Sequence, residues 1–160
     1  MAPTAEDFQR LVERVEALEA KIAINDLITT YGPAVDSGCA EAVASLWTED
    51  GVYDVDTGVM NGSKAIEAMV RSKAHQSWIG GGCGHLSEPL HVVVDGDTAV
   101  ATGHTQLVIH NGDGTFRVHR VTANRWELVR QDGAWKVAKR TGRVLDGRPE
   151  ARDLLAAGVQ

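Results

Sequence analysis

The sequence has little cysteine and no histidine cluster, and both shortages narrow the class of protein. Its two cysteines, Cys39 and Cys83, lie far apart and outside any C-x-x-C pattern, which argues against a disulfide framework and a zinc knuckle. The six histidines are scattered without the spacing of metal ligands. We therefore predict two reduced thiols and no metal ion.

Positive charge and long apolar runs are also missing. A formal net charge of -6 argues against a nucleic-acid groove. No apolar run approaches the roughly 18–20 residues that cross a bilayer, so no membrane partner is expected. Residues 1–7 have neither the basic nor the apolar region of a secretory signal. The prediction is a cytoplasmic protein.

The 160 residues, 43% of them hydrophobic, suit one domain spanning residues 1–160. We expect a core at about 20–145, a helical extension at 7–20 and a tail at 146–160 whose role the pattern does not indicate. An apolar stripe with helical 3,4,3,4 spacing consists of Phe8, Leu11, Val15, Leu18 and Ile22. This stripe is expected to pack against the chain's own sheet or against a neighbouring subunit. We favour a homo-oligomer, either a dimer or a trimer.

Helices are predicted in the first half of the chain and strands in the second. The first helix should kink or end at Pro33, which removes the backbone donor for the carbonyl of Thr29. A short helix capped by Ser37 is predicted at 40–47, a strand at 52–55 and a helix at 63–72. Asp-Gly turns then separate expected antiparallel strands at 90–94, 98–110, 115–130 and 134–141. This order predicts an α+β fold, a curved antiparallel sheet packed on N-terminal helices.

The strand at 115–130 carries polar residues on its apolar face. Strict alternation puts Thr122 and Asn124 on the same side as Phe116, Val118 and Trp126. A buried hydroxyl and amide without partners cost about 1–3 kcal/mol each. We therefore predict a polar pocket between this strand and the helices.

Asp36 and His85 are the main candidates for chemistry. Asp36 ends the predicted first helix, where it could cap the next helix or could orient an imidazole, and the residues alone leave both open. His85 follows "WIGGGCG", residues 78–84, which is either a flexible loop or an entrance segment that moves over a substrate.

Three stretches, "YGPAVDSG", "LWTEDGVYDV" and "RQDGAWKVAKR", resemble the SnoaL-like, nuclear transport factor 2-like superfamily over about residues 20–145. This resemblance implies a cone-shaped α+β domain around a central pocket. The motifs most resemble scytalone dehydratase, which implies catalytic roles for Asp36, His85 and His110 and a substrate contact at Thr122-Ala123-Asn124. Bile acid 7α-dehydratase adds a tyrosine like Tyr31, and hexachlorocyclohexane dehydrochlorinase an arginine like Arg140.

The resemblance implies a cofactor-independent dehydratase acting on a small hydrophobic or cyclic hydroxylated carbonyl compound. His85, oriented by Asp36, would remove the α-proton, and His110 would protonate the departing hydroxyl. Tyr31 or Tyr53, with Asn124, would stabilise the enolate oxygen. The further pocket walls are predicted to be Trp47, Met69 and Trp126, although such residues are more often core. The alternatives are a proton-shuttling isomerase or cyclase and a non-catalytic ligand-binding or assembly module.

Strand alternation weakens two of these candidates. It places His110 on the face opposite to Leu107 and Ile109, unless a bulge near Gly103 resets the pattern. It likewise sets Arg140 against Trp135, which favours a surface arginine at least as strongly as a pocket arginine.

Overall fold

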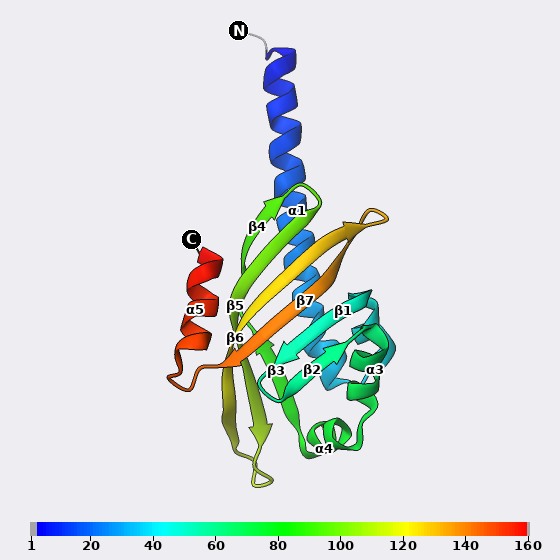
Figure 1. Cartoon of the computed structure of the whole chain (residues 1–160), viewed down its shortest axis with the longest axis vertical. Coiled ribbons are helices and arrows are strands. Elements are labelled where there is room, and N and C mark those ends of the chain that lie inside the picture. The colour runs from blue at the N-terminus through cyan, green and yellow to red at the C-terminus, as the bar shows by residue number, and fades with distance from the viewer. Residues whose placement is uncertain (1–2, 160) are drawn as a thin grey trace.

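The chain begins with one long helix, α1 (Ala5–Asp36), in a computed structural model that describes residues 3–159. Thr4 and Asp7 form a reciprocal capping box at its start. The first half of α1 extends beyond the rest of the molecule (Figure 1), and burial begins at Ala20. The helix does not end at Pro33, one of the two predicted outcomes there, because it runs three residues further to Asp36. Only one donor is lost there, and the backbone N–H of Ser37 still bonds the Pro33 carbonyl at 3.0 Å.

Three short helices follow: α2 (Ala40–Ser45), α3 (Ser63–Arg71) and α4 (Lys73–Gly81). Ser37 does not cap α2, because its hydroxyl donates to the Ala34 carbonyl and Cys39 is the N-cap residue. The glycine-rich segment after Trp78 is not a loop, since α4 continues to Gly81. Gly82, with φ of 90°, ends the helix in a conformation that glycine readily adopts.

Seven strands form one curved sheet: β1 (Trp47–Val55), β2 (Gly58–Asn61), β3 (Cys83–Ser87), β4 (His91–Asp95), β5 (Thr98–His110), β6 (Phe116–Gln131) and β7 (Ala134–Val144). The order is β2-β1-β7-β6-β5-β3, and β4 also pairs with β5. The α+β class is confirmed, but the sheet is mixed, because β1 pairs with β7 in parallel. Parallel strands need a long connection between them, and here the segment from α3 to β6 provides it. Turn signals in the sequence are local and do not reveal this pairing.

Two β-bulges change which side chains face the helices. Between β5 and β6, Leu107 pairs with Arg120 but Val108 pairs with Val118, so His119 is the extra residue. The predicted alternation therefore fails before the bulge, and Phe116 and Val118 are exposed. Between β6 and β7, Glu127 pairs with Lys139 but Leu128 pairs with Val137, so Ala138 is extra.

The core lies between the sheet and α1, α2 and α3. Its fully buried large side chains include Ile24, Ile28, Ile66, Trp126 and Leu128. The tail forms a helix that the sequence pattern did not indicate, α5 (Pro149–Val159), which contacts β5, β6 and β7. Within residues 3–159, no helix combines the length and apolar character needed to span a membrane.

Candidate active site

Asp36 and His85 meet where the end of α1 lies beside β3. Asp36 Oδ1 is 2.6 Å from His85 Nδ1, and Oδ2 accepts the backbone N–H of His85 at 2.7 Å. The predicted contact between the two residues is confirmed, and Asp36 does not cap α2. Gly32 allows this approach, because a Cβ at that position would lie 2.5 Å from the carbonyl oxygen of His85.

The hydrogen bonds define the charge of Asp36 and the tautomer of His85. Burial alone would raise the pKa of Asp36, but the bonds from the ring and backbone N–H of His85 outweigh it and lower that pKa below its ordinary value. An ionised carboxylate only accepts hydrogen bonds, so His85 Nδ1 carries a proton towards Asp36. In the neutral ring, Nε2 is then the nitrogen free to accept a proton.

His85 lines two neighbouring cavities. The inner cavity is narrow, about 20 Å³, and lies between β1, β5, β6 and β7. The outer cavity measures about 440 Å³, and α4 supplies part of its wall. Leu107 and Arg120 also line both cavities, so His85 stands at the junction of a polar inner end and a wider outer end.

A buried polar cluster closes the inner end. Asn124 is fully buried, and its Oδ1 accepts two hydrogen bonds from Arg140, from Nε at 3.0 Å and from Nη2 at 2.9 Å. The Asn124 amide group donates to Thr105 Oγ1 and to the carbonyl of Thr122, both at 3.0 Å. Thr122 lines the inner cavity as predicted, whereas Asn124 lies on the same face of β6 but lines neither cavity. Both ends of the Asn124 side chain are already engaged, which makes it a residue that positions Arg140.

Arg140 is 4% exposed and sits among aromatic rings. Its guanidinium carbon lies 4.2 Å from the ring centroid of Trp126, 4.7 Å from that of Tyr31 and 4.8 Å from that of Tyr53. Nη1 has no hydrogen-bond partner within the part of the chain that the structure describes, and no carboxylate there pairs with this cation. The expectation from strict alternation is wrong because the bulge at Ala138 turns Arg140 inwards, to the side of Val137.

The other predicted contact residues divide between cavity and core. Tyr53 lines the inner cavity and Met69 the outer one. Tyr31 is buried against Arg140, and burial raises its pKa, so its hydroxyl stays protonated. Trp47 and Trp126 line neither of these cavities and belong to the core.

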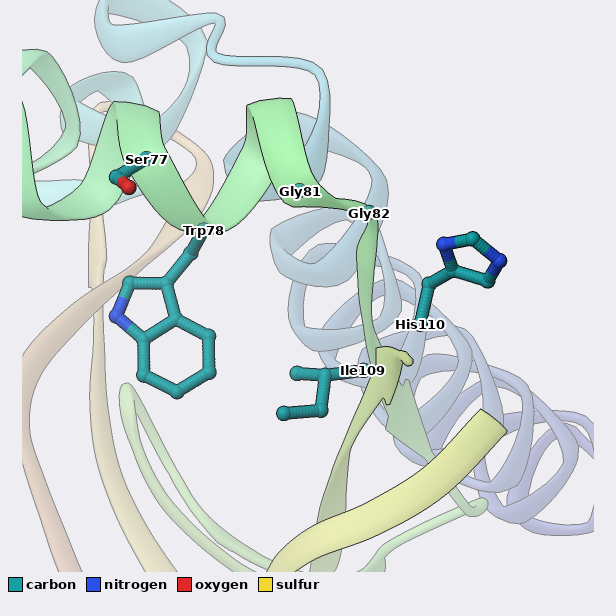
Figure 2. A pocket seen from close by; sticks show the side chains of 6 residues that line it. All are labelled: Ser77, Trp78, Gly81, Gly82, Ile109 and His110. Carbon is teal, nitrogen blue, oxygen red and sulfur yellow. The ribbon is translucent and has the colours of Figure 1, made fainter. Parts of the chain in front are cut away.

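His110 does not join the dyad. Figure 2 shows the Ile109 side chain directed towards Trp78 and the His110 ring directed to the other side of the strand. Both residues border a hollow of about 220 Å³ that is separate from the two cavities at His85. The ring nitrogens of His110 lie 3.3 Å from the backbone N–H groups of Gly112 and Gly114, and the nitrogen without a proton accepts one of them. The bulge that could have turned this side chain lies in β6 at His119 and leaves the alternation of β5 unchanged.

The family follows from the sequence. The family model of the SnoaL-like domain matches residues 16–141. The chain belongs to the SnoaL-like family. Its sequence has no significant match among the curated proteins. A solved NTF2-like protein with a cystatin-like fold from Novosphingobium aromaticivorans is 40% identical with a TM-score of 0.90, over 95% of this chain and 99% of that one.

Two more distant structures share the SnoaL-like fold. A Mycobacterium tuberculosis protein of unknown function is 23% identical, with a TM-score of 0.75, 88% of this chain covered and 85% of that one. The hexachlorocyclohexane dehydrochlorinase LinA-type3 from Novosphingobium barchaimii LL02 is 23% identical with a TM-score of 0.70, over 84% of this chain and 96% of that one. The fold thus occurs in an enzyme and in a protein without an assigned activity.

Two residues of this SnoaL-like cavity escaped the sequence analysis. His75, on α4, lines the outer cavity, and its ring stacks on that of His85 with 6.3 Å between centroids. Its Nε2 is 3.2 Å from the Val35 carbonyl, which can only accept, so Nε2 carries the proton. Arg120 lies on the same face of β6 as Thr122 and Asn124, beyond the bulge at His119, so strand alternation could have identified it as a cavity residue. No local pattern marks His75.

Among residues 3–159, one group of side chains could hold a metal ion. Donor atoms of Asp36, Cys83 and His85 all lie within 4.8 Å of one another. The Cys83 thiol donates to Asp36 Oδ1 at 3.8 Å, and burial together with the charge of Asp36 raises the pKa of Cys83. A thiolate ligand is therefore disfavoured, and a metal ion would have to replace the hydrogen bond between Asp36 and His85.

Proposed function

We propose that this protein is a cofactor-independent dehydratase that removes water from a small cyclic or aromatic β-hydroxy carbonyl compound. The observation that carries the proposal is the 2.6 Å contact between Asp36 and His85 at the junction of the two cavities. An ionised carboxylate that fixes one tautomer of a histidine is the usual arrangement of a general base. The two free thiols, Cys39 and Cys83, agree with a cytoplasmic location.

His85 would start the reaction by removing the proton on the carbon next to the carbonyl group. The proton moves to Nε2, and the electron pair of the C–H bond becomes an enolate. Asp36 then stabilises the imidazolium across the short hydrogen bond to Nδ1. A general base in this position contributes about 10²–10⁴ in rate.

Arg140 would stabilise the enolate oxygen. Its buried cation has no carboxylate partner among residues 3–159, and Nη1 is free to donate. A donor fixed in a buried site stabilises developing charge more than it would in water. Tyr53 lies on the same cavity wall, whereas Tyr31 and Asn124 hold Arg140 from behind.

The leaving hydroxyl needs a proton, and the position of His110 removes it from this role. We assign the donor to His85 itself. As the enolate electrons form the new C=C bond and the C–O bond breaks, the imidazolium returns its proton to the departing oxygen. The products are one water molecule and an α,β-unsaturated carbonyl compound, and neutral His85 is restored. This scheme requires the proton and the hydroxyl to leave from the same face of the substrate.

The outer cavity favours a flat and largely apolar substrate. Met69, Trp78 and Leu107 supply apolar walls, and His75 and Arg120 supply polar groups. A cavity of about 440 Å³ is in the range of small-ligand sites. An isomerase is the second candidate, because the same base and the same cation suffice when the substrate has no leaving group.

Incubation with a panel of cyclic and aromatic β-hydroxy ketones in D₂O tests the proposal. A dehydratase forms the conjugated ketone, seen by its ultraviolet absorbance and by the loss of one water in the mass spectrum. An isomerase exchanges the α-hydrogen for deuterium without loss of water. His85→Ala is the matched inactive variant and Asp54→Asn the control outside both cavities. Conversion at the same rate with His85→Ala would refute the mechanism.

A further inference from the structure

Five large apolar side chains on α1 are left uncovered by the rest of residues 3–159. Their exposed fractions run from 44% to 65%. They are Phe8, Leu11, Val15, Leu18 and Ile22. Ala20, Ile24 and Ile28, which pack on the body, lie about half a helical turn away from this stripe. The stripe therefore points away from the body along the part of α1 that extends beyond the sheet in Figure 1.

The spacing and the residue types match those of a two-stranded coiled coil. With Phe8 at heptad position a, Leu11 and Leu18 occupy d, and Val15 and Ile22 occupy a. β-Branched residues at a combined with leucine at d favour parallel dimers over trimers and tetramers. The capping box at Thr4 starts the helix before the first apolar position, so both heptads are fully helical.

The flanking charges fit the same arrangement. In a parallel dimer, position g of one helix faces position e of the partner five residues later. Arg14 at g would face Glu19, and Lys21 at g would face Asp26, which pairs opposite charges at both levels. Within the described chain, these four exposed residues form no ion pair. They are therefore free to pair with a second copy.

We infer that the protein is a parallel homodimer in which the apolar stripe of α1 packs against the same stripe of a second copy. About 100 Å² from each of ten side chains gives a total near 1,000 Å², close to the lower limit for a specific interface. The residues of α1 that pack on the body lie about half a helical turn from the stripe, so each body lies on the side of α1 away from the partner helix. The inference is independent of the proposed reaction.

A membrane surface is a poorer occupant for this stripe. Between residues 5 and 26, six acidic residues oppose three basic ones. Helices that lie in a membrane interface carry mainly lysine and arginine on the polar face. The acidic surplus of α1 would be repelled by anionic lipids.

The mass of the full chain in solution is the first test. At tens of micromolar, light scattering should give twice the 17.2 kDa of one chain. Leu11→Glu with Leu18→Glu should give a monomer with unchanged circular dichroism, because both sites are exposed. Gln9→Glu with Ala17→Glu adds the same charge on the outer face of α1 and should leave the dimer intact.

A charge exchange tests the register. In the dimer, residue 14 of each helix faces residue 19 of the other, which gives two equivalent contacts. Arg14→Glu places two acidic groups opposite each other in both contacts, and Glu19→Arg places two basic groups there. Each variant should weaken the dimer about tenfold, because both symmetry-related contacts change from an attraction to a repulsion. The double variant restores opposite charges and should return the dissociation constant to that of the wild type.

Cross-linking separates a parallel from an antiparallel pair. In a Cys39→Ser background, Leu18→Cys should form a disulfide with its own copy, because d positions of a parallel dimer face each other. In an antiparallel pair, a positions face d positions of the partner, so position 18 would face position 15, and only a mixture of Val15→Cys and Leu18→Cys chains would cross-link. Glu13→Cys, on the outer face, is the control and should not react.

Several results would overturn the inference. They are a monomer or trimer at tens of micromolar, a dimer that survives the two glutamates on the stripe, and cross-links only in the mixture. A monomeric chain that cosediments with vesicles of phosphatidylcholine and phosphatidylglycerol through this stripe would also overturn it.

Discussion

Replacing Asp36 by Asn keeps the shape of the side chain and removes its charge. In the wild type the carboxylate accepts hydrogen bonds from the ring and from the backbone N–H of His85, at 2.6 and 2.7 Å. An amide keeps only one oxygen. If that oxygen retains the backbone N–H, the amide nitrogen faces His85 Nδ1 and must donate to it. The ring then carries its proton on Nε2, the nitrogen that has to act as the base.

The size of the effect follows from those two bonds. A hydrogen bond to a charged group contributes about 1.5–3 kcal/mol and a neutral one about 0.5–1.5 kcal/mol. Asp36→Asn should therefore lower the free energy of unfolding by about 1–3 kcal/mol. Turnover should fall by about 10²–10⁴, because the wrong tautomer blocks proton removal. Combining the exchange with His85→Ala should cost little more than His85→Ala alone, since the two residues act as one unit.

Long-range ¹H–¹⁵N NMR spectra of the histidine rings measure the tautomer without any substrate. The neutral form of the His85 ring should carry its proton on Nδ1 in the wild type and on Nε2 in Asp36→Asn. The spectrum of His85→Gln assigns the signals. Asp54→Asn is a suitable control, because it removes a carboxylate of similar burial that pairs with Arg143 at 2.9 Å, away from the dyad. An unchanged tautomer in Asp36→Asn would refute the reasoning.

Four further outcomes are expected. Gly32→Ala should lower the free energy of unfolding in urea by about 1–3 kcal/mol, because its Cβ would lie 2.5 Å from a backbone oxygen of β3, and a neutral result would contradict that contact. Arg140→Met should reduce turnover about 10²–10³-fold while stability changes by less than about 1 kcal/mol, since lost bonds to Asn124 offset removal of a buried charge. His110→Ala should change turnover by no more than about twofold. A fall of about 10²–10⁴, as expected on removal of a general acid, would show that His110 takes part in the reaction. Because the pKa of Asp36 is lowered in the folded state, its charge stabilises the fold at pH values above the ordinary carboxyl pKa. The difference in free energy of unfolding between wild type and Asp36→Asn, measured in urea, should therefore be constant above about pH 5 and should shrink as the pH falls below about 4.

The sequence alone determined the features that depend on local spacing. The 3,4,3,4 stripe and its polar flanks specify a helix, and Asp-Gly turns specify hairpins, because each signal lies within a few neighbouring residues. The resemblance of "YGPAVDSG" and the strand around His85 to known motifs identified Asp36 and His85, and their contact is confirmed. The run through Pro33 was missed, because one lost hydrogen bond does not end a helix that is packed on both sides of it.

Only the tertiary structure decided which side chains reach the cavity. Alternation is counted along a single strand, but the pairing with the neighbouring strand sets which side chains face the core. The extra residues His119 in β6 and Ala138 in β7 each put the side chains on their two sides onto opposite faces of the sheet from those that strict alternation predicts. The extra residue in β6 turns Phe116 and Val118 outwards, and the one in β7 buries Arg140, whereas β5 has no such residue and His110 stays outside. The parallel pairing of β1 with β7 was also decided by the tertiary structure, because these strands are far apart in the sequence and their contact leaves no local pattern in the chain.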